Sequence, residues 1–201
     1  MIRIWIGGGP CSGKSSIADV IAARLGGVVY HADEYFLQHG ARAPQNSRIR
    51  RVTEASFADL FQREVEVMLS DYLAVSEEEF PMIVEDLPDT SSAPLVVEGC
   101  ALLPCLMSAV LMPQDVFVIL APSEAFQRRT YAGRPGVAGT LEEVRDPNLV
   151  WESWRRRDAA FSALVREDAI RFGFPVIDVD GTESIDTVAN HVWALVQVEG
   201  A

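Results

Sequence analysis

The sequence predicts an α/β protein of three layers, in which helices cover both faces of a parallel sheet of five strands. Two observations predict it. Short apolar, β-branched runs alternate with longer stretches whose apolar residues recur at helical spacing, and this alternation implies parallel strands joined by right-handed helical crossovers. The length of 201 residues, 49% of them hydrophobic, suits one sizeable core. We therefore expect a single domain over residues 1–201.

The chain begins with a strand, a glycine turn and a helix. The run IRIWI at 2–6 is short and apolar, as expected of a buried strand. After the glycines, apolar residues at helical spacing predict a helix over 15–25. The β-branched run GVVYHAD at 27–33 predicts the second strand.

Three segments of different polarity follow. Residues 37–52 contain Gly, Pro, Asn and four arginines, and they predict an exposed loop. Residues 53–73 predict a helix with Thr53 or Ser56 as its N-cap. Residues 76–92 are acidic and interrupted by prolines, so we place them at the surface and assign no regular element to them.

The second half of the chain returns to the alternation of strand and helix. Residues 94–99 and 115–120 are short β-branched runs that predict two strands. Residues 123–134 predict a helix capped by Ser123, and the glycine-rich residues 133–139 predict a flexible connection. The remaining expected elements are a long helix over 149–172, a strand over 174–181 and a last helix over 184–198.

Charge and hydropathy argue against several classes of partner. The net charge is −12, whereas nucleic-acid binders normally carry a basic surface, so we expect no nucleic-acid partner. No basic and apolar leader begins the sequence, and the longest uncharged stretch, residues 99–114, is shorter than the roughly 20 residues that span a bilayer. We expect a cytoplasmic protein without membrane contact, either a monomer or a homodimer.

The glycine run after the first strand carries the strongest motif. Residues 8–15, GGPCSGKS, match G-x-x-x-x-G-K-[ST] between a strand and a helix, as the motif requires. Its glycines let backbone N–H groups turn towards phosphate oxygens, and the helix N-terminus adds a positive dipole. Lys14, the only lysine beside sixteen arginines, supplies a compact charge for the β- and γ-phosphates, and Ser15 offers a hydroxyl to Mg²⁺. The residues expected at the nucleotide are Gly8, Gly9, Pro10, Cys11, Ser12, Gly13, Lys14, Ser15 and Ser16.

With this motif and one short domain, the chain resembles the P-loop NTPases, and within them the nucleoside and nucleotide kinase-like small-molecule kinases. It is similar to the uridine kinase, nicotinamide riboside kinase, chloramphenicol phosphotransferase, shikimate kinase and gluconate kinase types. The resemblance extends from the first strand to the last helix. It implies a three-layer P-loop fold with a short helical lid. It also implies a kinase that uses ATP and Mg²⁺ to phosphorylate a hydroxyl or phosphate of a small acceptor.

Two acidic residues follow strands in positions that the resemblance makes significant. The stretch HADEYF at 31–36 looks like the Asp-Asp-Phe-Tyr segment of uridine kinase-type enzymes, which makes Asp33 the candidate base and Glu34 the fallback. The alternative is that Asp33 caps the next helix. VVEG at 96–99 resembles the Val-Glu-Gly of the same kinases, so Glu98 would hold Mg²⁺ through water or touch the acceptor. A solvated acid at a strand end is the alternative.

The resemblance places a lid over about residues 128–157 and an adenine contact after the last strand. Lid arginines of such kinases close over the phosphates, and we favour Arg128 and Arg134 for this role, with part of it open to Arg155, Arg156 and Arg157. Consecutive arginines on a helix point in different directions, so at least one of each group should face solvent. The Arg-Asp-x-x-x-Arg pattern of the uridine kinase-type lid is not found here. Backbone contacts at Gly181 and Thr182 would meet the adenine.

The acceptor should bind to a segment of about residues 33–63. Its positive side chains, above all Arg42, Arg48 and Arg51, suit a carboxylate or phosphate on the acceptor. Tyr35 and Phe36 suit a stacked ring instead. A solvated basic loop is the alternative to both, and the sequence leaves the acceptor open.

A second class of function is a nucleotide-binding regulatory NTPase or switch that acts through a protein partner. GTP-selective switches carry an Asn-Lys-x-Asp motif, and the single lysine of this chain is already part of the phosphate loop. A small-molecule kinase is therefore the favoured interpretation.

Overall fold

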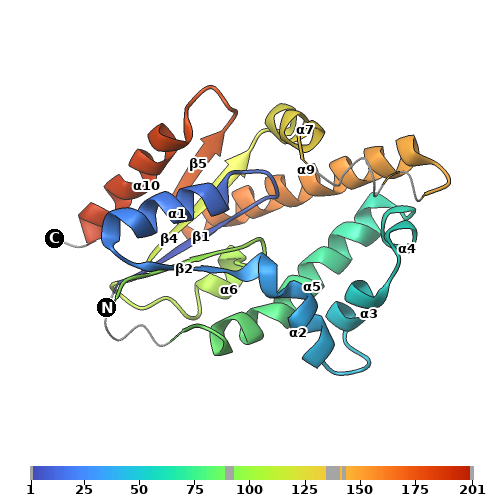
Figure 1. Cartoon of the computed structure of the whole chain (residues 1–201), viewed down its shortest axis with the longest axis horizontal. Helices are drawn as coiled ribbons and strands as arrows, with labels where there is room; N and C mark the ends of the chain where they lie inside the picture. The colour runs from blue at the N-terminus through green and yellow to red at the C-terminus, as the bar shows by residue number, and fades with distance from the viewer. Residues whose placement is uncertain (1, 89–92, 135–140, 142–143, 200–201) are drawn as a thin grey trace.

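The computed structural model describes residues 2–88, 93–134, 141 and 144–199. Its centre is a parallel sheet of five strands in the order β2-β3-β1-β4-β5 (Figure 1). This confirms the predicted fold class, because helices cover both faces of the sheet. The strands are β1 (Arg3–Gly8), β2 (Val28–His31), β3 (Leu95–Glu98), β4 (Val116–Pro122) and β5 (Val176–Val179).

The helices divide between the two faces of the sheet (Figure 1). One face packs against α1 (Lys14–Leu25) and α10 (Ile185–Glu199). The other packs against α5 (Val65–Glu85), α6 (Pro104–Met107) and α9 (Pro147–Phe172). Beyond the carboxyl end of β4 lies α7 (Glu124–Ala132), which Ser123 caps as predicted by accepting a hydrogen bond from the N–H of Phe126. Among the described residues, no helix is both long and apolar enough to cross a membrane.

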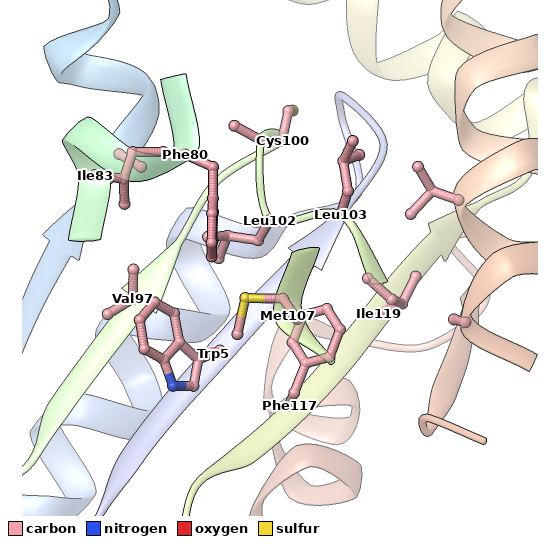
Figure 2. Packing of buried hydrophobic residues seen from close by; sticks show 14 of the residues in the cluster. Trp5, Phe80, Ile83, Val97, Cys100, Leu102, Leu103, Met107, Phe117 and Ile119 are labelled. Atoms are coloured by element: carbon pink, nitrogen blue, oxygen red, sulfur yellow. The ribbon is translucent and has the colours of Figure 1, made fainter. Parts of the chain in front are cut away.

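Alternate residues of each strand enter opposite halves of the core. In β1, Ile4 and Ile6 face α1 and α10, whereas Trp5 packs on the other face with Met107 and Phe117 (Figure 2). All of these side chains are at least 96% buried. The sheet is therefore held firmly on both faces, and the loops at its carboxyl edge extend from a rigid base.

The prediction of an exposed loop over 37–52 is wrong. The segment forms two short helices, α2 (Phe36–Arg42) and α3 (Arg48–Glu54). Ile49 is fully buried among side chains that include Val75 of α5, and Ser47 caps α3. The arginines made the segment look solvated, whereas α3 is held by the complete burial of one apolar residue, Ile49.

The helix predicted over 53–73 is divided in the structure. After α3 ends at Glu54, Ser56 caps the short helix α4 (Phe57–Phe61) by accepting from the N–H of Asp59. The acidic segment that we left without a regular element mostly continues α5, through Pro81 to Glu85. Glu78 of this segment has a structural role, since it accepts hydrogen bonds from the N–H groups of Arg48 and Ile49. Residues 89–92 lie outside the described part.

Candidate functional site

The phosphate loop joins β1 to α1, and its backbone conformation explains its glycines. Gly8 and Gly13 have φ angles of +131° and +86°, and Cys11 has +61°, a left-handed region that most side chains avoid. A Cβ atom at Gly8 would collide with the carbonyl of Leu120 on β4, and one at Gly9 with Ser162 of α9. The loop is thus wedged between strand and helix, and its N–H groups belong to a fixed turn.

Lys14 lies at the centre of the site with 5% of its surface exposed. Its Nζ donates a hydrogen bond to the carbonyl of Gly9 at 3.1 Å and lies 3.3 Å from Sγ of Cys100, after β3. Burial opposes its charge, but Cys100, Asp33 and Glu98 more than offset this and hold the pKa of Lys14 above its usual value. Burial raises the pKa of Cys100 to about 12, so that group is a neutral thiol. Lys14 is therefore a cation at neutral pH, surrounded by the ends of β2 and β3.

Asp33 belongs to the 3₁₀ helix Ala32–Tyr35 that follows β2. Its Oδ1 accepts a hydrogen bond from the N–H of Cys100 at 2.9 Å, so the loop after β3 orients the carboxylate. Neither the 3₁₀ helix nor α2 is capped by this side chain. The bond to Cys100 leaves the other oxygen of Asp33 available, as a proton acceptor must be.

Glu98 ends β3 with 2% of its surface exposed. Its Oε1 lies 2.9 Å from Nδ1 of His31, while Oε2 is buried without a hydrogen-bond partner among the described residues. Burial lowers the pKa of His31, but the hydrogen bond and charge of Glu98 raise it above its usual value. A buried carboxylate oxygen without a partner is costly unless water or a cation meets it.

These donors fit a magnesium ion shared with a nucleotide. Mg²⁺ usually keeps several waters and binds one or two protein oxygens together with phosphates. Among the described residues, no cluster of three or more His, Cys, Asp or Glu side chains could hold a metal ion. The candidate ligands are the hydroxyl of Ser15, exposed at the start of α1, and the buried oxygen of Glu98 that has no hydrogen-bond partner among the described residues.

Two cavities open on this arrangement. The first, which we call the loop cavity, has a volume of about 390 Å³ and includes every residue from Pro10 to Ser16 in its wall. Its wall also includes Arg134, one of the two favoured lid arginines, and Arg157, one of the three to which part of that role was left open. Arg128 lies on α7 beside Arg155 at a small crevice instead. Residues 135–140 and 142–143 of the predicted lid lie outside the described part.

The second, which we call the α5 cavity, has a volume of about 300 Å³. Five residues line both cavities, so the two meet in one place: Asp33, Phe61, Tyr72, Cys100 and Arg157. The remaining wall of the α5 cavity is mostly apolar and comes largely from α5: Phe36, Val52, Leu60, Arg63, Met68, Asp71, Val75, Ser76, Glu79 and Ala101.

Arg157 of α9 is the basic residue that joins the two cavities. Its guanidinium carbon lies 4.9 Å and 4.5 Å from the ring centroids of Phe61 and Tyr72. Its Nε lies 2.5 Å from Oδ1 of Asp158 in an ion pair, and the other oxygen of this buried carboxylate accepts a hydrogen bond from the hydroxyl of Tyr131. Of its neighbours, Arg156 is exposed and Arg155 pairs with Glu152. The sequence showed three adjacent arginines, and only the packing of α9 selects among them.

The arginines expected at the acceptor line neither cavity. Arg42 pairs with Asp86 at 2.8 Å, and Arg48 with Asp71 at 2.8 Å. Arg51 is exposed on α3. The structure places Arg63 in the α5 cavity instead, paired with Asp71 at 2.6 Å.

Of the two aromatic candidates for acceptor binding, only Phe36 lines the α5 cavity. Tyr35 stacks on Tyr30 with ring centroids 4.8 Å apart. Tyr35 therefore supports the end of β2 from outside the cavity.

The turn after β5 lies apart from both cavities. Thr182 donates from its N–H and its hydroxyl to Asp180, and it lines a third cavity of about 670 Å³ between α7, α9 and the ends of β4 and β5. Gly181, with φ of +82°, approaches Phe126 and Arg129 so closely that a Cβ atom would meet both. An adenine contact at this turn stays a prediction.

Comparison with known proteins identifies the fold. No protein-family model matches the chain, and no curated protein does. A solved shikimate kinase from Acinetobacter baumannii in complex with shikimate is 12% identical, with a TM-score of 0.55 over 98% of this chain and 93% of that one. A sugar kinase from Janibacter is 14% identical, with a TM-score of 0.52 over 98% and 95%. At such identities similarity establishes architecture rather than activity. The chain has the fold of the P-loop small-molecule kinases.

Proposed function

We propose that this protein is an ATP- and Mg²⁺-dependent phosphotransferase that moves the γ-phosphate of ATP to a hydroxyl or phosphate of a small acceptor. One observation carries the proposal: a cavity walled by the phosphate loop and a separate, largely apolar cavity meet at Asp33. A nucleotide in the first and an acceptor in the second would bring the reacting groups together there. A carboxylate at the junction favours a hydroxyl as the reacting group, because a hydroxyl must lose a proton when it attacks.

The transfer forms a bond between the acceptor oxygen and the γ-phosphorus. It breaks the bond from that phosphorus to the β–γ bridging oxygen, which keeps the electron pair and leaves as part of ADP. Asp33 accepts the hydroxyl proton, and its hydrogen bond from Cys100 fixes its direction. Positive charge around the moving phosphoryl group comes from Lys14, Arg134 and Arg157. In a loose transition state, this stabilisation of charge contributes more than a stronger base would.

Magnesium would be held by Ser15 and, through water, by the oxygen of Glu98 that has no hydrogen-bond partner among the described residues. The ion would offset part of the negative charge of the phosphates. The residues of the chain that prepare this position are His31 and Asp19. His31 fixes the other oxygen of Glu98 at 2.9 Å and lies 3.4 Å from Asp19.

The test is ADP release from Mg-ATP across a panel of acceptors: nucleosides, nucleoside monophosphates, sugar acids, shikimate, and aminoglycoside and phenicol drugs. Stimulation by one class of acceptor that disappears in Lys14→Ala establishes a kinase. ATP turnover that no acceptor stimulates, together with a protein partner that binds only the nucleotide-loaded form, would favour a regulatory NTPase and contradict the proposal.

We also expect Arg157→Ala to lower kcat by about 10²- to 10³-fold, because a guanidinium that contacts both cavities stabilises charge that develops during transfer. Arg156→Ala is the matched control, since that side chain is exposed on the same turn of α9, and it should leave kcat unchanged. Thermal unfolding measurements distinguish this role from a purely structural one. If Arg157→Ala lowers only the melting temperature and the folded variant keeps its kcat, the residue merely compensates the charge of Asp158.

A further inference from the structure

The walls of the α5 cavity indicate what kind of acceptor it takes. Three aromatic rings, from Phe36, Phe61 and Tyr72, enclose it together with the aliphatic side chains of α5. A volume of about 300 Å³ is at the lower end of the range for small-molecule sites. Such walls favour a compact ring over an extended polar chain, because the apolar faces of a ring can pack against the aromatic and aliphatic side chains of the wall.

The charges of the cavity argue against an acidic acceptor. Its wall includes three carboxylates, from Asp33, Asp71 and Glu79, against the two guanidinium groups of Arg63 and Arg157. Both guanidinium groups already have acidic partners, since Arg63 lies 2.6 Å from Asp71 and Arg157 2.5 Å from Asp158. A site for a carboxylate needs an arginine fork free to bind it. Arg63 and Arg157 are each held by an acid through one nitrogen, and the carboxyl groups of Asp33 and Glu79 face the same cavity without an arginine partner among the described residues, so they would repel an acidic acceptor.

Glu79 is the polar group that stands out in this wall. The residue is 95% buried, and Nδ1 of His39 lies 2.8 Å from its Oε1. His39 is fully buried, and its Nε2 lies 3.2 Å from Asp86, which Arg42 holds at 2.8 Å. A connected series of polar contacts therefore extends from the surface to Glu79 at the cavity.

This arrangement prepares a hydrogen-bond acceptor in an apolar wall. A buried carboxyl that one histidine binds through one oxygen has its second oxygen available to a ligand. A few placed polar groups in an apolar pocket usually fix the orientation of the molecule bound there.

Resting on the proposed function, we propose that the acceptor is a hydroxylated ring compound without an acid group, which donates an N–H or O–H group to Glu79 while its reacting hydroxyl faces Asp33. The ring lies among Phe36, Phe61 and Tyr72. Glu79 and Asp33 then recognise two different donors of one molecule, and this fixes which hydroxyl reacts.

The experiment compares two sets of compounds in the ADP-release assay with the whole chain and Mg-ATP. One set contains hydroxylated ring compounds with N–H or O–H donors and no acid group, namely nucleosides and phenicols. The other contains the hydroxy acids shikimate and gluconate. Glu79→Met removes the acceptor atoms at similar length, Glu79→Gln keeps one oxygen without the charge, and Glu77→Gln is the control, being exposed on the same helix.

We expect turnover with a compound of the first set, a KM raised by roughly 10- to 100-fold in Glu79→Met with a smaller rise in Glu79→Gln, and wild-type KM in Glu77→Gln. Turnover with the hydroxy acids alone would overturn the inference and leave the kinase in place. So would turnover of a ring compound whose KM is the same in wild type and both Glu79 variants. Absence of any turnover that depends on Lys14, with either set, would overturn the proposed function and the inference with it.

Discussion

Lys14→Ala should reduce acceptor-stimulated ADP release by about 10³-fold or more, because it removes a positive charge aimed at the transferring phosphoryl group from a buried, low-dielectric position. Lys14 is 5% exposed, and its ammonium lies between the carbonyl of Gly9 and the thiol of Cys100. Water can replace little of the lost charge in such a position. The measurement is initial velocity against Mg-ATP concentration, with the melting temperature recorded for each protein.

Two further variants make this result specific. Lys14→Arg keeps the charge, but its broad planar fork does not fit where a compact ammonium contacts a carbonyl and a thiol, so it should also be strongly impaired. Arg24→Ala removes a cation from the last turn of the same helix, where it binds Asn190 at 2.8 Å, and should behave like wild type. Wild-type turnover in Lys14→Ala would remove the basis for placing the phosphates at residues 8–16.

The sheet and the phosphate loop could be predicted because their signals are local. Each strand is a short run such as the one around Ile4 and Ile6, and the loop motif fixes Gly8, Gly13 and Lys14 within eight residues. The rule that ligands meet the carboxyl edge of a parallel sheet then predicted Asp33 and Glu98 as neighbours. In the structure both raise the pKa of Lys14.

The acceptor side could not be predicted in the same way, because its geometry is tertiary. Four arginines made residues 37–52 look like a solvated loop, while the burial of Ile49 against α5 decides that they form helices. The prolines around the acidic segment suggested a break, yet α5 continues through Pro81 and carries Glu79 to the cavity. No local pattern distinguishes Arg157 from Arg155 and Arg156. Their roles follow from the rotation of α9 against Phe61 and Tyr72.

Asp33→Asn should lower kcat by about 10²- to 10⁴-fold while the affinity for ATP changes little. The substitution preserves shape: the amide oxygen of Asn can still accept the hydrogen bond that Asp33 receives from the N–H of Cys100 at 2.9 Å. What is lost is the proton acceptor and its negative charge. Binding of Mg-ATP by calorimetry, beside single-turnover transfer, separates these effects.

Glu34→Gln provides the matched control for the base. Glu34 is also an exposed carboxylate of the same 3₁₀ helix, one position along, but it lines neither the loop cavity nor the α5 cavity. If Glu34→Gln abolishes transfer while Asp33→Asn retains it, the base is Glu34. If Asp33→Asn weakens ATP binding and leaves transfer per bound ATP unchanged, then Asp33 serves the metal or the loop after β3. A loss of transfer confined to Asp33→Asn would identify Asp33, the carboxylate that lines both cavities, as the group that accepts the proton.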